Sequence, residues 1–352
     1  MATLASNALT YADWAKRVGE DYKIAMIIEM LSQTNEIMTD MLVMEGNLPT
    51  GNKSIVRTGL PSGTWRLLNA GIQPTKSTTA PIVDTCGNLE AESQIDKDVA
   101  SLADDQARFR LSESMAFLEG MTQQMASTVI YGSTAVNPDR FTGLAPRYNS
   151  VLTTTALSAA NVIDMGGTGS DNTSIWIVTW GERTTCGIFP KGKITGLQHT
   201  DMGLQRIQDV NQTFATGAYF WGWVDHFKWE LGLQVRDWRY NVRLCNIDVS
   251  DLATVNAANI INGLIRGLNR LPTTAVGTTA VQTSDSPNVQ GSMGKTVIYV
   301  NRTVRTYLEL QVENKTNIWL QLREYDGQVV LTFRGVPIRT VDAILNNEAR
   351  VV

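Results

Sequence analysis

Histidine and cysteine are scarce in this sequence, which contains only His199 and His226 and three widely spaced cysteines. Histidine is the usual acid–base group near neutral pH and the commonest metal ligand. Two isolated histidines without a partner motif fit a sheet surface or an interface better than a catalytic site. Cys86, Cys186 and Cys245 form no C-x-x-C pair, which excludes the usual zinc and thioredoxin motifs. Their odd number indicates small buried side chains in a reducing cytosol.

Charge is also low. Charged residues make up 18% of the chain, and 30 Lys and Arg against 34 Asp and Glu leave a net charge of -4. No run of five basic residues occurs, whereas a nucleic-acid binder normally shows a basic domain or stripe. A protein that encloses DNA without binding it tightly is equally compatible with this balance. Nine Trp and 43% apolar residues argue against global disorder.

Long apolar runs are absent. The longest fall far short of the roughly 20 residues that a membrane-spanning helix needs. The N-terminal residues 1–17 lack the apolar core of a signal peptide. We therefore expect a protein that is made in a cytoplasm and stays soluble or assembles there, with no membrane partner.

The motifs of common enzymes are missing as well. Residues 187–193, GIFPKGK, match a phosphate-binding loop except at its last position, where Ile194 replaces the magnesium-binding Ser or Thr. Pro190 also removes one of the backbone amides that would bind phosphate. The GGTG sequence at 166–169 lacks the spacing of a dinucleotide site. We predict no catalytic, cofactor-binding or metal-binding residue, and no enzymatic activity.

The first 131 residues divide into three segments. Apolar residues at helical spacing, in a stretch with five Met between Met26 and Met44, predict an amphipathic helix that ends at Gly46, either in the core or as an arm on a neighbouring subunit. Residues 48–97 contain short β-type runs broken by Gly and Pro, which predicts a protruding two-stranded loop. Residues 98–131 contain no Pro and a helical apolar pattern, which predicts one rod of roughly 45–50 Å.

Strands predominate afterwards. SIWIVTW at 174–180 predicts a strand, and the run 218–249 alternates an aromatic face with a mixed face. The aromatic face fits core or interface packing, or stacking of single-stranded bases, although acidic residues interrupt it. We expect a helix capped by Ser250 or Asp251 and an exposed loop from 272 to 294. Strands at 296–300, 329–333 and 336–345 complete the chain.

Several segments, in order, resemble the major capsid proteins of tailed bacteriophages in the podovirus-like group. They are ADWAKR (12–17), EGNLPTG (45–51), RTGLPSGTWRLLNAG (57–71), KSTTA (76–80), FLEGM (117–121), YGSTAVNPDRFTGLAPRYN (131–149), TSIWIVTWGE (173–182), PKG (190–192), WELGLQVRDWRYNVRLCNID (229–248), YVNRTVRTYL (299–308) and GVPIRTVDAIL (335–345).

The resemblance implies the α+β capsid fold of the Hong Kong 97 type. Its parts would be an N-terminal helical arm (1–47), an extended two-stranded loop (48–97), a peripheral domain (98–250) with a spine helix at 98–131, and an axial domain (251–352). The implied function is structural. Copies would self-assemble into pentamers and hexamers of an icosahedral phage head that encloses double-stranded DNA in the virion.

The implied partners are other copies of the chain, a separate scaffolding protein, a portal and a decoration protein. A separate scaffold is expected because the sequence has no long N-terminal extension of the kind that some members cleave. Some members also cross-link a lysine to a neighbour's asparagine, but no motif here selects such a pair. An encapsulin-like compartment, which shares the fold, is the alternative function.

Overall fold

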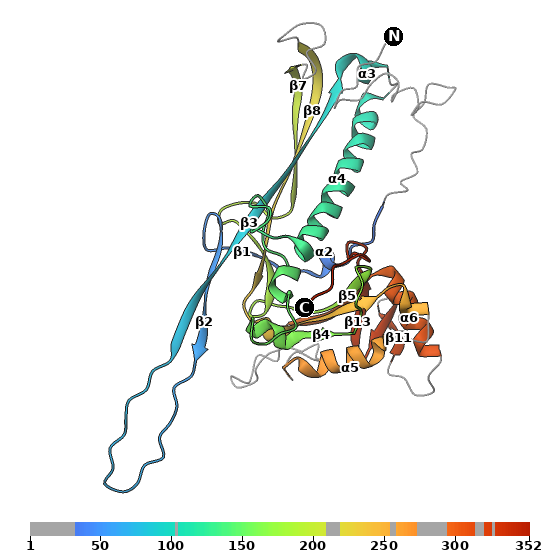
Figure 1. Ribbon diagram of the computed structural model, residues 1–352. Coiled ribbons are helices and arrows are strands. Elements are labelled where there is room, and N and C mark those ends of the chain that lie inside the picture. The colour runs from blue at the N-terminus through green and yellow to red at the C-terminus, as the bar shows by residue number, and fades with distance from the viewer. Residues whose placement is uncertain are drawn as a thin grey trace. The chain divides into compact units, whose positions relative to one another are not determined.

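A computed structural model describes residues 32–102, 105–208, 219–253, 258–272, 294–313, 320–325 and 328–352. The α-helices are α2 (Ile37–Asp40), α3 (Lys97–Ser101), α4 (Gln106–Tyr131), α5 (Ile260–Arg270) and α6 (Arg302–Glu313). The strands are β1 (Val43–Glu45), β2 (Gly51–Gly59), β3 (Thr78–Asp96), β4 (Val162–Asp164), β5 (Asn172–Trp180), β6 (Thr185–Phe189), β7 (Leu197–Gln208), β8 (Tyr219–Val235), β9 (Asn241–Asp248), β10 (Lys295–Val300), β11 (Leu320–Tyr325), β12 (Gln328–Phe333) and β13 (Val336–Thr340). The fold is α+β (Figure 1).

The chain divides into two compact units. The described part of the first unit consists of residues 32–33, 88–102, 105–125, 195–208 and 219–230. The second unit consists of Thr34–Gly87, Ala126–Ile194 and Leu231–Val352. Each unit therefore draws on segments that are distant in the sequence, and each is described by itself below.

The second unit is built around strand β5, in which every residue is buried. Strands pair in the order β11–β12–β13–β10–β5, and β5 also pairs with β9 in antiparallel register. Because side chains alternate across a strand, Ile175 and Ile177 lie on one face of the sheet, and Ser174 and Trp176 lie on the other.

Helices α5 and α6 cover the isoleucine face of this sheet. Leu264 and Leu268 of α5 and Val304 and Leu308 of α6 are buried in one apolar cluster with strand residues such as Ile177. This cluster is the main core of the second unit, and in Figure 1 both helices lie beside the sheet. Burying each such side chain stabilises the unit by about 1.5–3 kcal/mol.

The first unit has a smaller core beneath a two-stranded ribbon. Strands β7 and β8 pair antiparallel from Leu197↔Trp229 to Gln208↔Tyr219. Ile95, Ala100 and Phe109 are buried, with Trp223 of β8 packed against them. A Cβ on Gly222 would lie 2.9 Å from the Ile95 carbonyl oxygen, so only glycine allows this close approach.

Most predicted strands are confirmed. The runs at 174–180, 296–300 and 329–333 lie in β5, β10 and β12, and 336–340 forms β13. The helical pattern at 98–131 does not form the single predicted rod: it forms two helices, α3, which ends at the C-cap Leu102, and α4, which begins at Gln106. The side chain of Asp96 caps α3 by accepting a hydrogen bond from the Asp98 amide.

Three other predictions of local structure are wrong. The first helix does not continue to Gly46, because the described part ends at Asp40 and Val43–Glu45 forms β1, paired with β6. Helix α5 is capped by Asn259 rather than Ser250 or Asp251, since the Asn259 side chain accepts from the Asn262 amide. The run 218–249 forms two strands, β8 and β9, separated by a short 3₁₀ turn at Trp238–Tyr240.

The earlier part of the predicted N-terminal helix and most of the predicted loop at 272–294 lie outside the described residues. The boundaries between arm, extended loop, peripheral domain and axial domain stay predictions.

Candidate assembly surface

A long exposed segment connects β2 and β3 in the second unit. The two strands pair antiparallel from Gly51↔Thr85 to Gly59↔Thr78, which confirms the predicted two-stranded arrangement. Every residue from 60 to 79 is exposed, and the connecting chain continues past the strand ends in Figure 1. We call residues 60–77, the connection between the two strands within the predicted two-stranded loop (48–97), the extended loop.

The extended loop exposes large apolar side chains. They are Leu60, Trp65, Leu67, Leu68 and Ile72, and Trp65 is fully accessible. Large contiguous apolar exposure is uncommon in monomeric proteins and marks surfaces that contact other molecules. The sequence signal was the run WRLL at 65–68, three of whose residues are large and apolar, between glycines and prolines without helical or strand periodicity.

The same region is basic. Residues 47–83 contain Lys53, Arg57, Arg66 and Lys76 but no Asp or Glu. By contrast, Asn88–Met125 and Thr195–Glu230 of the first unit hold twelve acidic and five basic residues. Glu90 and Asp98 are among the exposed acidic residues there. The chain thus carries an exposed basic segment and a separate acidic unit.

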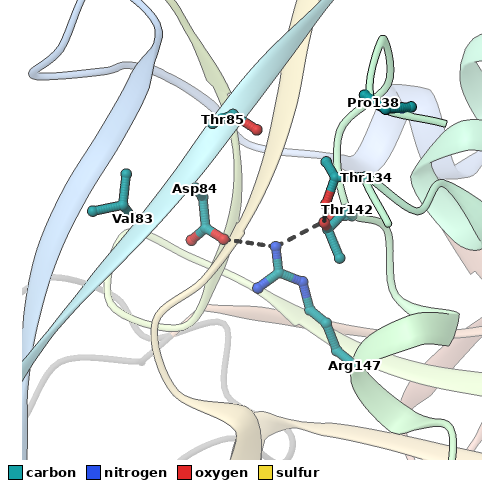
Figure 2. Close-up of a pocket in the computed structure, with 7 residues that line it drawn as sticks. All are labelled: Val83, Asp84, Thr85, Thr134, Pro138, Thr142 and Arg147. Carbon is teal, nitrogen blue, oxygen red and sulfur yellow. Dashed lines mark hydrogen bonds and ion pairs between the residues drawn. The ribbon is translucent and has the colours of Figure 1, made fainter. Parts of the chain in front are cut away.

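The base of the two strands is held firmly within the second unit. Arg147 donates to Asp84 Oδ1 at 2.7 Å and to the carbonyl oxygens of Thr142 and Leu233 at 3.2 and 3.1 Å. Figure 2 shows this ion pair beside β3. A Cβ on Gly51 would lie 2.0 Å from the Asp84 carbonyl oxygen, so the strands approach closely at that point. The extended loop therefore starts from a rigid base.

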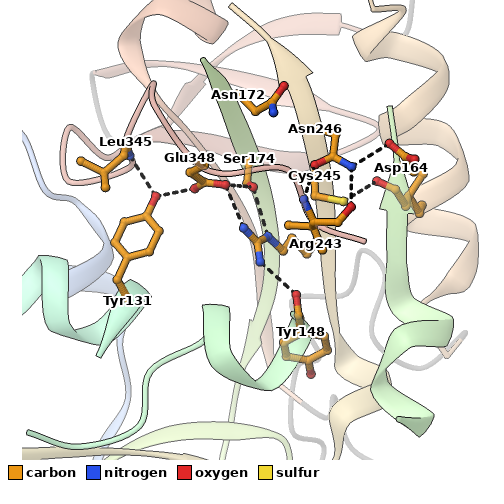
Figure 3. A network of polar contacts seen from close by, with 12 residues as sticks. Tyr131, Tyr148, Asp164, Asn172, Ser174, Arg243, Cys245, Asn246, Leu345 and Glu348 are labelled. Carbon is orange, nitrogen blue, oxygen red and sulfur yellow. Dashed lines mark hydrogen bonds and ion pairs between the residues drawn. The ribbon is translucent and has the colours of Figure 1, made fainter. Parts of the chain in front are cut away.

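A buried polar network lies on the face of the sheet opposite α5 and α6 (Figure 3). Arg243 of β9 donates to Glu348 at 2.8 Å, and the side chains of both are only 5% exposed. Ser174 also donates to Glu348, at 2.5 Å, and Tyr131 donates to its other oxygen. Arg243 Nη1 donates to the Tyr148 carbonyl oxygen at 2.9 Å. Burial and the Glu348 charge raise the pKa of Tyr131 far above its ordinary value, so Tyr131 stays a donor.

A second contact ties the C-terminal residues to β9. Asn246 has a left-handed backbone with φ 57°. Its side chain donates to the Val351 carbonyl oxygen and to Asp164, and accepts from the Val351 amide at 2.8 Å. These two networks connect residues about a hundred positions apart, and no sequence motif indicated them.

The two histidines occupy the β7–β8 ribbon of the first unit without meeting each other. His199 Nε2 lies 3.0 Å from Asp225 Oδ1, and its ring stacks on Phe227. His226 immediately precedes Phe227 on β8, so its side chain lies on the opposite face, 3.5 Å from Glu90. Among the described residues, neither histidine belongs to a group of three or more side chains that could hold a metal ion.

The ion pairs beside His199 organise the first unit. Arg110 of α4 lies 2.8 Å from carboxylate oxygens of both Asp201 and Asp225. Its guanidinium also stacks 4.8 Å from the Trp223 ring. The hydrogen bond from Arg110, followed by that from the Gly203 amide, lowers the pKa of Asp201. The ion pairs of Arg110 with Asp201 and Asp225 therefore hold α4 against β7 and β8.

The aromatic residues of β8 do not form a continuous exposed row. Phe227 is buried and stacks on Phe117 at 5.9 Å, whereas Tyr219 and Trp221 are about half exposed. Arg206 lies 3.8 Å from the Tyr219 ring. The face packs mainly within the first unit, and only its end near Tyr219 is open.

The sequence resembling a phosphate loop is not followed by a helix. Thr185–Phe189 is strand β6, and the chain enters strand β7 at Leu197. The Gly192 amide donates to Glu45 at 2.8 Å. In the described ranges, no group of three or more His, Cys, Asp or Glu residues is arranged to hold a metal ion. None of the helices described is long and apolar enough to cross a membrane.

The chain matches the family model "Major capsid protein GP7" over residues 19–352. This chain belongs to the GP7 family of major capsid proteins. A chain in the cryo-EM structure of bacteriophage Epsilon15 is 34% identical, with a TM-score of 0.74 and coverage of 100% of this chain and 99% of the other. Both findings confirm the predicted resemblance to tailed-phage major capsid proteins and the α+β capsid fold of the Hong Kong 97 type.

More distant structures resemble this GP7-family protein weakly. A chain of the bacteriophage JBD30 capsid is 8% identical with a TM-score of 0.44, covering 90% of this chain and 92% of the other. A chain from the capsid of a native GTA particle is 11% identical with a TM-score of 0.43, covering 65% and 93%. No curated protein matches the sequence. The GP7-family chain is thus a structural protein of an icosahedral phage capsid, which favours this function over an encapsulin-like compartment.

Proposed function

We propose that copies of this major capsid protein form the pentamers and hexamers of the phage head, and that the extended loop of each copy lies on a neighbouring copy. The observation that carries the proposal is the complete exposure of residues 60–79 above a firmly held base. An exposed segment with this much apolar surface gains stability only when another surface covers it.

The energetics favour a contact between copies. Covering the five large apolar side chains of the extended loop would contribute on the order of 10 kcal/mol before ordering costs. Ordering a loop on a partner opposes this by about 0.5–1.5 kcal/mol for each immobilised flexible side chain. The net gain for one contact is modest, and repetition over many copies makes the shell stable.

Charge complementarity supports the acidic first unit of a neighbour as the receiving surface. The extended loop and the adjoining strand residues, 47–83, contain four basic residues and no acidic one. The basic residues are Lys53, Arg57, Arg66 and Lys76. Exposed Glu90, Glu92, Asp98 and Asp105 lie in the first unit. Opposite charge on two contacting surfaces increases the association rate and sets the register, and salt weakens it.

The proposal extends to the other partners. The shell encloses genomic DNA without sequence-specific contacts, because the mildly acidic chain has no basic stripe to bind it tightly. Assembly takes place in the host cytoplasm with a separate scaffolding protein and a portal, and a decoration protein joins the finished shell. In this function the protein acts by assembly alone, and it needs no catalytic residue, cofactor or metal ion.

The test is assembly of a loop variant. We expect the double variant Trp65→Ser, Leu68→Ser to fold but to raise the critical concentration for shell formation, because it removes apolar area that only a neighbour covers. The matched control Trp65→Phe, Leu68→Met keeps apolar side chains and should assemble normally. Shells of ordinary yield from the serine variant, seen by negative-stain microscopy and light scattering, would refute the role of the extended loop.

A further inference from the structure

Helix α4 exposes two large apolar side chains on one side in the first unit. Leu111 is 62% exposed and Met115 is 64% exposed. Residues four positions apart on a helix are neighbours on its surface, so these two side chains form one apolar stripe. Ser114 and Met121, on another side of α4, are buried. The stripe of Leu111 and Met115 is therefore apolar surface that another segment can cover.

Glu119 lies one turn beyond Met115 on the same side of α4 and holds the start of the described chain. Its Oε1 accepts hydrogen bonds from the Gln33 amide at 2.9 Å and from the Gln123 side chain at 2.7 Å. Gln33 belongs to the first unit, and the described part of the chain begins at Ser32. The chain that precedes Gln33 therefore arrives at α4 within one turn of the apolar stripe.

The sequence just before Gln33 matches this stripe in chemistry and spacing. Residues 24–31, IAMIIEML, contain one charged residue. In the amphipathic helix that the sequence predicts there, Ile24 and Ile28 lie four positions apart, as Leu111 and Met115 do. At about 1.5 Å per residue in both helices, a segment that runs parallel to α4 and ends at Glu119 brings Ile28 level with Met115 and Ile24 level with Leu111.

The other direction along α4 offers no such match. Past Glu119 the same side of the helix continues with the polar residues Thr122 and Gln123. An apolar segment would gain little by covering them. A copy of residues 24–31 from another subunit would have to give up its translational freedom, whereas the segment joined to Gln33 is already held beside α4 at a high effective concentration.

We propose that residues 24–31 dock on the stripe of Leu111 and Met115 of their own subunit and run parallel to α4. The sequence alone left open whether this segment packs within its own subunit or on a neighbour. The hydrogen bond between Gln33 and Glu119 favours its own subunit. The docking site is a different surface from the extended loop, so failure of this proposal would leave the proposed function intact.

Engineered cysteines in the full chain test the docking directly. Met115→Cys is combined in turn with Ile27→Cys and with Ile28→Cys, so that a shift of one residue does not hide the contact. The subunit is oxidised before assembly and in shells. We expect a disulfide within one chain, seen as linked tryptic peptides by mass spectrometry and as a monomer on a non-reducing gel. A disulfide between two chains, or none with either partner, would overturn the proposal.

Gly120 provides the matched control for the cross-link. It is exposed, and a Cβ at this position would have no atom within 4 Å. Position 120 lies about 140° around the helix from Met115, so the docked segment does not reach it. Gly120→Cys should form no disulfide with Ile27→Cys or Ile28→Cys. Cross-linking equal to that of Met115→Cys would show that the segment has no fixed place on α4 and would overturn the proposal.

Trypsin provides a second, quantitative test on the unassembled subunit. The double variant Leu111→Ser, Met115→Ser removes the apolar stripe at two exposed positions. We expect cleavage after Lys23 to accelerate about tenfold or more, because the segment loses the apolar surface that holds it. The control Leu111→Met, Met115→Leu keeps the stripe and should be cleaved at the wild-type rate.

An unchanged cleavage rate for a folded serine variant would overturn the proposal. Circular dichroism of the unassembled subunit establishes whether the variant folds. If it does not fold, the disulfide experiment decides.

Discussion

Replacing Glu348 with Gln should destabilise the second unit strongly. Glu348 is 5% exposed and accepts hydrogen bonds from Arg243 at 2.8 Å, from Ser174 at 2.5 Å and from Tyr131. Gln has nearly the same volume, so the change leaves no cavity, but it leaves the buried Arg243 charge unpaired. Removing one partner of a buried ion pair costs about 3–5 kcal/mol.

Hydrogen exchange measures this loss where it occurs. Whole-chain unfolding is a poor probe because a chain with two compact units need not unfold in one step. The amides of β5 and β9 flank the network, and their exchange reports the free energy of local opening. A loss of about 3–5 kcal/mol accelerates their exchange by roughly two to four orders of magnitude.

A surface variant provides the control. Glu309→Gln removes the same charge from a residue that is 51% exposed and pairs with Arg305 at 3.2 Å across one helical turn. Exposed pairs of this kind contribute about 0.5 kcal/mol, so exchange in β5 and β9 should hardly change. Exchange within threefold of wild type for Glu348→Gln would show that the buried pair does not stabilise the sheet.

Two further predictions concern titratable groups. Burial raises the pKa of Cys186 to about 11 and of Cys245 to about 12, so at pH 8 iodoacetamide should label the half-buried Cys86 first; equal labelling by peptide mass spectrometry would contradict this. The lowered pKa of Asp201 adds stability that is present above its ordinary value near 3.8 and is lost as the pH falls through the folded value. The temperature at which the first unit unfolds should therefore drop in acid, and Asp201→Asn should weaken that pH dependence; an identical pH profile would exclude this contribution.

The local sequence pattern predicted those elements whose conformation depends mainly on residues nearby in the chain. The short apolar run at 174–180 and the helical apolar spacing within 98–131 both lie in observed elements, because a β-branched apolar run favours a buried strand and a helical period favours a helix. The first helix was extended too far, since Val43–Glu45 is apolar enough for either structure and pairing with β6 makes it a strand. Ser, Asp and Asn are all favoured N-cap residues, so the sequence could not decide whether Ser250, Asp251 or Asn259 caps α5.

The amino-acid sequence by itself determined the family, the α+β class and the position of an exposed two-stranded loop, because these depend on ordered motifs and on local periodicity. It also excluded the common catalytic motifs through the scarcity of His and Cys. Only the tertiary structure paired Arg243 with Glu348 and placed Arg147 beside Asp84, residues 105 and 63 positions apart. Contacts between such distant residues depend on how strands stack into a sheet, and no single segment encodes that arrangement.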